Sequence, residues 1–177
     1  NGKELDLYFP DKKIAIEFNG GYWHSDIYKN SRYHQDKILL AEQNGIHLIN
    51  IYEYEWYDNE YKTKIVNFIK RAVDNNTNKI YARNTEVKEI DNNAAYDFLN
   101  KYHLQRSVNA VIHLGIFEGN KLLGVMTLGT PRFDTGYQYE ILRIEYKDNI
   151  VIVGGTEKLF HYFVDKYKPS SIVSYCN

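Results

Sequence analysis

The chain opens with two short segments in which polar and apolar residues alternate. Glu4 to Phe9 and Ile14 to Asn19 follow this two-residue period, and Pro10 to Lys13 between them has the composition of a turn. Alternation on both sides of a four-residue loop predicts a β-hairpin. We therefore expect the first two elements of the chain to be antiparallel strands.

A helical pattern follows the hairpin. Arg32 to Asn44 has the pattern of a helix, and Gly45 is suited to end it. His47 to Tyr54 then has the pattern of a strand, and a helix with one apolar stripe is expected from Glu60 onward. These elements predict a strand-strand-helix-strand-helix unit that ends near residue 74.

A polar stretch without periodicity, Asp74 to Asn78, is the best candidate for a linker. We predict a first domain over residues 1–74, a linker over 75–85 and a second small domain over 86–177. The elements expected in the second domain are a helix over Ala94–Tyr102, a hairpin over Val111–Phe117 and Lys121–Gly129, a strand over Tyr139–Tyr146, a helix over Thr156–Tyr167 and a strand over Ser171–Tyr175. The expected fold class is therefore mixed α/β (α+β) in both domains.

The hairpin register places two carboxylates opposite each other. With a turn over Pro10 to Lys13, Phe9 pairs with Ile14, and Asp6 then lies opposite Glu17. One face would be apolar and the other polar. The predicted apolar face is Leu5, Leu7, Phe9, Ile14, Ile16 and Phe18, and the polar face is Glu4, Asp6, Glu17 and Asn19.

Two interpretations of the carboxylate pair remain open at this point. Directly opposed like charges repel each other, and a hard divalent cation such as Mg²⁺, which prefers carboxylate oxygen and water, would relieve that repulsion. Alternatively, the polar face is simply solvated, and Lys12 or Lys13 offsets its charge.

The residues after the hairpin favour the metal site. Hydrolysis of a phosphodiester requires a metal ion, a group that handles the proton and a cation for the developing charge. Suitable side chains follow Glu17 closely, and Gly20 and Gly21 allow the backbone to turn toward them. They are Tyr22, Trp23, His24, His34, Asp36 and Lys37. A site for metal-dependent hydrolysis between Asp6 and Lys37 is therefore predicted.

A family resemblance rests on the same part of the chain. The segments that carry it are Asp6, Ile14–Gly20, Tyr22–His24, Tyr33–Lys37, Gly45–Ile49 and Glu55–Trp56. In these segments the chain resembles the very-short-patch-repair (Vsr) endonucleases and related phage homing endonucleases of the PD-(D/E)XK nuclease superfamily. The resemblance implies a restriction-endonuclease-like core, a mixed sheet flanked by helices. It also implies that Asp6 binds Mg²⁺ (or Mn²⁺), that His24 assists proton transfer and that Asp36 supports His24.

The chain departs from the superfamily pattern at two points. The second strand carries Asn19 where an acidic-x-lysine motif has its lysine, so Lys37 or His24 is expected to replace it. A glutamate from a preceding helix is absent, so either this fragment has lost it, or Glu4 or a partner supplies that charge. The candidate catalytic residues are Asp6, Glu17, His24, His34, Asp36 and Lys37, the candidate metal ligands are Asp6 and Glu17, and the candidate DNA contacts are Asn19, Tyr22 and Trp23.

The second half gives a weaker signal. Its predicted order of elements, with Gly154-Gly155 before a helix, is similar to the acetyltransferase (GNAT) fold, in which amides at that helix start hold a pyrophosphate. The apolar run before the glycines departs from that family, and Glu157 competes with a bound phosphate. A DNA-recognition domain is the other interpretation, with Arg106, Arg132 and Arg143 as candidate phosphate contacts.

Composition narrows the functional classes. The formal net charge of −1 argues against a polycation that coats nucleic acid, and the single cysteine, Cys176, excludes an internal disulfide and a four-thiolate zinc site. No apolar run is long enough to cross a membrane. We expect a cytoplasmic protein of a bacterial or phage-infected cell. The absence of an initiator methionine suggests a fragment of a longer protein.

The leading hypothesis is therefore a Mg²⁺-dependent endonuclease that nicks or cuts double-stranded DNA. The alternative is an acyltransferase-like DNA modification protein whose first domain binds nucleic acid. A third hypothesis is a DNA-binding module with an inactive nuclease domain. Dependence of turnover on both Asp6 and Glu17 separates the first hypothesis from the others.

Overall fold

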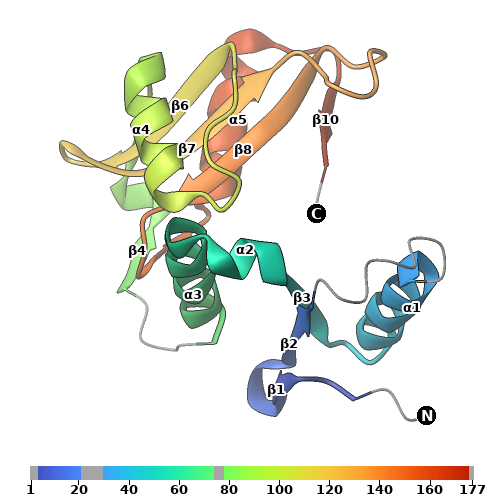
Figure 1. Cartoon of the computed structure of the whole chain (residues 1–177). Helices are drawn as coiled ribbons and strands as arrows, with labels where there is room; N and C mark the ends of the chain where they lie inside the picture. The colour runs from blue at the N-terminus through green and yellow to red at the C-terminus, as the bar shows by residue number, and fades with distance from the viewer. Residues whose placement is uncertain (1–3, 21–29, 74–77, 176–177) are drawn as a thin grey trace. The chain divides into compact units, whose positions relative to one another are not determined.

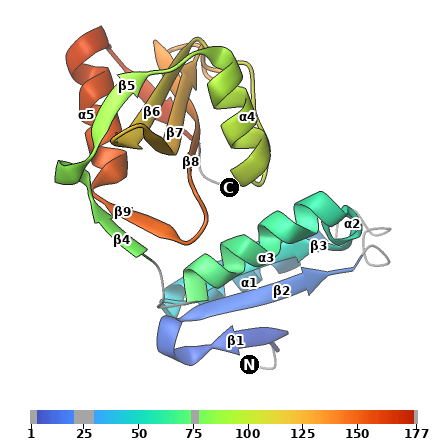
Figure 2. The ribbon, with the colours of Figure 1, turned by 90° about the vertical axis from the view of Figure 1, so that its left-hand side faces the viewer.

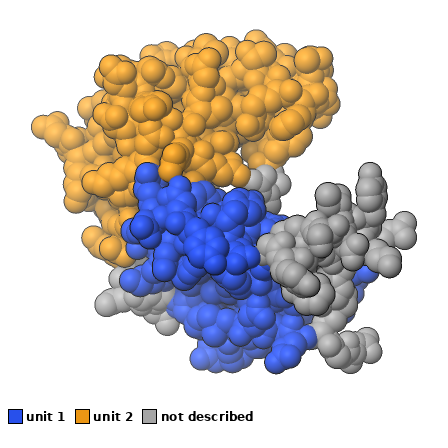
Figure 3. Space-filling model, in the orientation of Figure 1, with its two compact units in different colours: residues 1–75 blue, residues 76–177 orange. Residues whose placement is uncertain are grey.

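The computed structural model describes residues 4–20, 30–73 and 78–175. The chain divides into two compact units, residues Asn1–Asn75 and Asn76–Asn177, coloured separately in Figure 3. Each unit contains strands and helices, so the protein has a mixed α/β fold with mixed sheets flanked by helices. No helix in the described part of the chain is long and apolar enough to cross a membrane.

The first unit is built on a three-stranded sheet with the order β1-β2-β3. β1 is antiparallel to β2, and β2 is parallel to β3, as the crossover through α1 requires (Figure 1). Its elements are β1 (Leu7–Phe9), η1 (Pro10–Lys12), β2 (Ile14–Asn19), α1 (Asn30–Gln43), β3 (His47–Tyr52), α2 (Glu53–Tyr57) and α3 (Asn59–Val73).

The predicted hairpin register is confirmed. Phe9 pairs with Ile14, and Leu7 pairs with Ile16. The turn between the strands is a single 3₁₀ turn, and Lys13 follows it in the left-handed conformation with a φ of 53°. That conformation reverses the chain within four residues, which fixes the strand pairing.

The predicted division into one apolar and one polar hairpin face is wrong in part. Leu7 and Phe18, both assigned to the apolar face, are 48% and 42% exposed. Ala15, on the opposite face, is fully buried, and its neighbours Ile14 and Ile16 are also buried. β2 is the central strand and is covered on both faces, so burial there does not follow the two-residue period.

The strand predicted over His47 to Tyr54 ends earlier, at Tyr52. The Glu55 carboxylate accepts a hydrogen bond from the Tyr52 amide at 3.0 Å, which caps the start of α2. Asp58 then accepts from the amides of Glu60 and Tyr61, which starts α3. Local capping therefore converts the end of the predicted strand into a short helix.

The second unit contains a five-stranded sheet with the order β10-β8-β7-β6-β5. All neighbouring strands are antiparallel except β10 and β8, which are parallel. The elements are β4 (Asn78–Tyr81), η3 (Ala82–Asn84), β5 (Glu86–Glu89), α4 (Asn92–Tyr102), β6 (Ile112–Glu118), β7 (Lys121–Gly129), β8 (Tyr139–Tyr146), β9 (Ile150–Val153), α5 (Gly155–Tyr167) and β10 (Ile172–Ser174).

α4 and α5 cover opposite faces of this sheet (Figure 2). Met126 of β7 packs in the same cluster as Leu159 and Phe163 of α5. Its neighbour Val125 points to the other face and packs against Phe98 of α4. β7 is therefore covered on both sides and lies at the centre of the second core.

The linker predicted over residues 75–85 is wrong beyond residue 77. Residues 78–81 form β4, which pairs in parallel with β9 from Asn78↔Ile150 to Tyr81↔Val153. The pairing buries Ile80 and Ile152 in the second core. Polar composition suggested a free segment here, but a distant strand in the sequence supplies the hydrogen-bond partners.

Candidate functional site

A buried ion pair joins α1 to β2 in the first unit. The Lys37 ammonium donates a hydrogen bond to Glu17 Oε1, and the side chains are only 6% and 13% exposed. Glu17 lies in the central strand, and Lys37 shares its helix face with buried Ala41, four residues later. The sequence placed both residues at the candidate site, and the structure adds that they contact each other.

The second oxygen of Glu17 has no partner. Among the described residues, Glu17 Oε2 is buried and accepts no hydrogen bond. An unsatisfied buried oxygen costs about 1–3 kcal/mol, and more when the group is charged. A buried carboxylate with one oxygen bound by a lysine and the other unoccupied is therefore suited to hold a further cation.

Asp6 lies one residue beyond the last paired position of β1. The strand pairing ends at Leu7↔Ile16, so the position of Asp6 opposite Glu17 stays a prediction from the register. Asp6 is exposed, and its Oδ2 accepts a hydrogen bond from the Phe18 amide at 2.8 Å. This contact fixes the carboxylate at the edge of β2, next to the Glu17 position.

Two carboxylates are enough for a hard divalent cation that keeps several waters, but not for a site made of protein ligands alone. No group of three or more His, Cys, Asp and Glu side chains suited to a metal occurs within residues 4–20, 30–73 and 78–175. Mg²⁺ commonly takes one or two protein carboxylates and keeps several waters. The unpartnered oxygen of Glu17, with Asp6 across the strand pair, meets that smaller requirement.

The remaining predicted residues of the first unit are placed only in part. Asp36 is exposed on α1, and His34 lies in α1, although its side chain is outside the described part of the structure. Asn19 is buried, and its amide donates to Asn50 across β2 and β3 at 3.2 Å. A DNA contact by Asn19 stays a prediction. The residues outside the described part are Tyr22, Trp23 and His24.

A second buried ion pair, in the second unit, was not anticipated from the sequence. Glu140 of β8 is fully buried, and Arg132 holds both of its oxygens. Arg132 donates from Nε and Nη2 to Oε1 at 2.9 and 2.6 Å, and from its backbone amide to Oε2 at 2.7 Å. These hydrogen bonds from Arg132 hold the pKa of Glu140 below its ordinary value. β8 also carries Arg143 and Glu145, so no signal in the sequence singled out Glu140.

The arginines proposed as phosphate contacts are therefore not equivalent. Arg132 is committed to Glu140. Arg143 donates to the Arg106 carbonyl at 3.3 Å and to the Leu142 carbonyl at 2.7 Å. Arg106 is exposed, in the left-handed conformation with a φ of 57°. Since Arg143 is half-buried and Arg132 is bound to Glu140, exposed Arg106 is the better candidate for a phosphate contact.

The start of α5 does not resemble an open phosphate cradle. The Tyr146 hydroxyl and the Thr156 hydroxyl are hydrogen-bonded at 2.9 Å. A Cβ on Gly155 would meet Ile152 and the Tyr146 hydroxyl at 2.9 and 3.0 Å. Glu157 lies in the first turn. The side chains of this unit therefore already occupy the space around the helix start.

Comparison with known proteins gives one partial match. Residues 84–140, which run from η3 into β8 of the second unit, match the model of the Mom protein family. The match covers less than half of the chain and none of the first unit. No curated protein matches the chain.

Proposed function

We propose that the first unit is a Mg²⁺-dependent endonuclease of the Vsr-like or homing type, which hydrolyses phosphodiester bonds in double-stranded DNA. The observation that carries this proposal is the state of Glu17. One oxygen of its buried carboxylate is held by Lys37, and the other has no partner among the described residues. A purely structural ion pair would not require an unoccupied carboxylate oxygen.

Each side chain has a distinct role in this proposal. Glu17 Oε2 and Asp6 would hold Mg²⁺ (or Mn²⁺), which when bound polarises the phosphate and lowers the pKa of water. Lys37 orients Glu17 and places a positive charge beside the site. His24, supported by Asp36, would handle the proton, and the resemblance described above is the support for that role. His34 would assist from α1.

Supercoiled plasmid provides the test. The parent chain should convert it to nicked or linear DNA with Mg²⁺ and leave it intact with a chelator. Asp6→Asn and Glu17→Gln should each remove this conversion while circular dichroism shows an unchanged fold. Glu60→Gln is the matched control, because Glu60 is an exposed carboxylate that also pairs with a buried lysine. Cleavage by either site variant at the parental rate would exclude the metal site.

His24→Ala tests the proton role separately. General acid–base groups typically contribute about 10²–10⁴-fold in rate, so single-turnover cleavage should slow while DNA affinity stays within a few-fold. Equal losses of rate and affinity would assign His24 to DNA contact or to structure instead.

A second candidate function concerns residues 84–140. Mom is a phage DNA modification protein, so the match favours DNA modification by the second unit, as in the alternative drawn from the sequence. The crowded start of α5 argues against a bound pyrophosphate there, and recognition of DNA without acyl transfer is the simpler role. Calorimetric titration with acetyl-CoA separates the two, since micromolar binding would support modification. Either function places the protein in the cytoplasm with DNA as its partner.

A further inference from the structure

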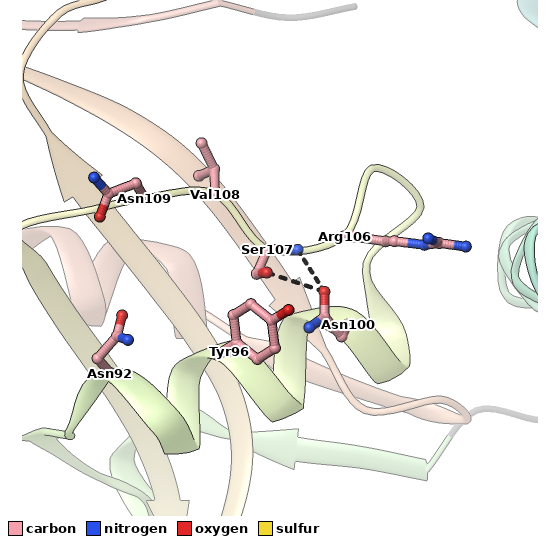
Figure 4. Close-up of a pocket in the computed structure, with 7 residues that line it drawn as sticks. All are labelled: Asn92, Tyr96, Asn100, Arg106, Ser107, Val108 and Asn109. Atoms are coloured by element: carbon pink, nitrogen blue, oxygen red, sulfur yellow. Dashed lines mark hydrogen bonds between the residues drawn. The ribbon is translucent and has the colours of Figure 1, made fainter.

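A polar pocket of about 440 Å³ lies in the second unit, between α4 and the segment 106–109. α4 contributes Asn92, Tyr96 and Asn100, and the segment contributes Arg106, Ser107 and Asn109 among its lining residues (Figure 4). Ligand pockets commonly have volumes of about 300–1,000 Å³. The pocket is therefore large enough for one small molecule or one nucleotide unit.

Three carboxamides line the pocket, and they have different roles. Asn100 Oδ1 accepts hydrogen bonds from the amide and the hydroxyl of Ser107, both at 3.0 Å, which fixes the segment against α4. Asn92 and Asn109 are exposed, and neither side chain forms a hydrogen bond to another described residue. A carboxamide offers a donor and an acceptor side by side, which matches the edge of a nucleobase.

Tyr96 supplies an aromatic surface in the same place. Its side chain is 54% exposed, and it has no aromatic or hydrogen-bond partner within residues 78–175. Figure 4 shows the ring between α4 and the facing segment, directed toward Ser107. Exposed aromatic rings of this kind stack on unpaired bases, and each stack contributes about 1–3 kcal/mol.

A cation lies at the rim of the pocket. Figure 4 shows the Arg106 side chain extending away from the other lining side chains. The Arg106 backbone has a positive φ, which is uncommon for a residue other than glycine, and Arg143 holds its carbonyl. Arg106 is thereby positioned to contact a phosphate outside the pocket while the lining residues contact a base inside it.

A row of polar side chains crosses the sheet beneath α4. His113, Thr127 and Arg143 are aligned by the register of β6, β7 and β8. Thr127 is fully buried, and its hydroxyl and His113 Nδ1 have no partner in the described part of the chain. One end of the row approaches Asp91, next to Asn92, and the other holds Arg106. Neither His113 nor Thr127 lines the pocket, so this row lies beneath the elements that form the pocket and does not contact an occupant.

We propose that this pocket binds a single nucleobase turned out of a DNA strand. Tyr96 stacks on the base, Asn92 and Asn109 pair with its edge, and Arg106 contacts the flanking phosphate. This inference rests on the proposal that the chain acts on DNA, but it requires neither cleavage nor a metal ion. Enzymes and recognition proteins that read an extruded base combine aromatic stacking with hydrogen bonds to the base edge.

Nucleotide binding to the full chain tests the proposal. Saturation-transfer NMR in the absence of divalent metal would compare the four deoxynucleoside monophosphates with 2-deoxyribose 5-phosphate, which lacks a base. We expect at least one nucleotide to bind and the sugar phosphate to bind far more weakly. Tyr96→Ala should weaken binding about tenfold, which corresponds to one stacked base, whereas Tyr96→Phe should retain it. Asn92→Ala and Asn109→Ala should each weaken binding several-fold.

Two variants control the measurement. Asn120→Ala removes an exposed carboxamide from the turn between β6 and β7 and should leave binding unchanged. Glu17→Gln should also bind nucleotides normally, so a failed nuclease and a failed base pocket give different results. Equal binding of the sugar phosphate and the nucleotides would overturn the proposal, as would parental binding by Tyr96→Ala or no nucleotide binding at all.

Discussion

The two units each bury a glutamate against a cation, and the two pairs differ in how completely the carboxylate is satisfied. In the second unit, Arg132 occupies both oxygens of Glu140 with three hydrogen bonds. In the first unit, Lys37 occupies one oxygen of Glu17, and no described residue occupies the other. Both carboxylate oxygens of Glu140 are therefore hydrogen-bonded, whereas one oxygen of Glu17 has no partner among the described residues.

The difference agrees with a structural role for the Arg132 pair and with the ligand site proposed at Glu17. The Arg132 guanidinium donates twice to Oε1 and the Arg132 backbone amide donates to Oε2, so this pair needs nothing further and holds its loop against β8. An ammonium is a point charge, and Lys37 leaves half of Glu17 available. Burial and charge alone would not distinguish these two glutamates. The hydrogen-bond partners of each carboxylate oxygen do distinguish them.

The largest effect is expected from removing the Lys37 charge. Lys37→Met keeps the length of the side chain but removes the cation beside Glu17. Single-turnover cleavage with Mg²⁺ should fall about 10²–10³-fold, the range for losing one electrostatic contact at a reacting centre. Lys64→Met is the matched control, because Lys64 is also a buried lysine paired with a glutamate. Similar losses in both variants would show a general effect of burying methionine.

The next largest effect is expected on the free energy of unfolding, which should fall by different amounts when each ion pair loses one partner. Arg132→Ala leaves Glu140 buried without its cation and should lower the free energy of unfolding by about 3 kcal/mol, near the low end for buried pairs because Arg132 is partly exposed. Glu17→Gln leaves buried Lys37 without its counter-charge but keeps an amide oxygen to accept its hydrogen bond and removes an unsatisfied charged oxygen, so the loss should be smaller, about 1–2 kcal/mol. Urea denaturation measures both, and equal destabilisation would remove the contrast between the pairs.

The sign of the pH effect follows from the Glu140 carboxyl. Because its pKa is lowered in the folded state, the pair stabilises the fold at pH values above the ordinary pKa of about 4.5, and this contribution is lost as the pH falls toward the folded value. Glu140→Gln should remove this part of the acid sensitivity. Denaturation midpoints at pH 7 and below pH 4.5 provide the comparison, and an unchanged difference would assign the acid sensitivity to other groups.

Mg²⁺ should stabilise the first unit but not the second. At a concentration ten times its dissociation constant, a ligand raises the free energy of unfolding by about 1.4 kcal/mol. We expect such an increase in the parent chain and in Arg132→Ala, and its absence in Glu17→Gln. Thermal unfolding with Ca²⁺ as a second hard cation provides the comparison. An increase that persists in Glu17→Gln would place the ion elsewhere.

The smallest effect is expected from His113, an unsatisfied but neutral group of the second unit. Burial lowers its pKa, and the charge of Asp91 only partly opposes this. The unfolded chain then binds the proton more readily, so His113 destabilises the fold as the pH falls below about 6.5. His113→Asn should reduce the loss of stability between pH 7.5 and 5.5. His161→Asn, at an exposed histidine, should leave that loss unchanged.

The candidate site of the first unit could be located from the sequence because its central feature is local. The two-residue period of a strand and a four-residue turn together fix which residues face each other, so the pairing of Phe9 with Ile14 and of Leu7 with Ile16 followed from counting. Similarly, the helical pattern placed Lys37 on α1. Three-dimensional information was needed to show that Lys37 reaches Glu17, because the β2-α1-β3 crossover sets that contact.

The sequence by itself determined the period of most elements and the hairpin register, and it supplied the set of candidate side chains. The tertiary structure decided which polar atoms have partners. β4 found its partner in β9, Arg132 closed over Glu140, and α4 met the segment 106–109 to form a pocket, all through contacts between residues distant in the sequence or on loops. Local periodicity is set by backbone geometry and can be read along the chain. The satisfaction of a buried polar atom depends on which segments pack together, and only the folded chain specifies that.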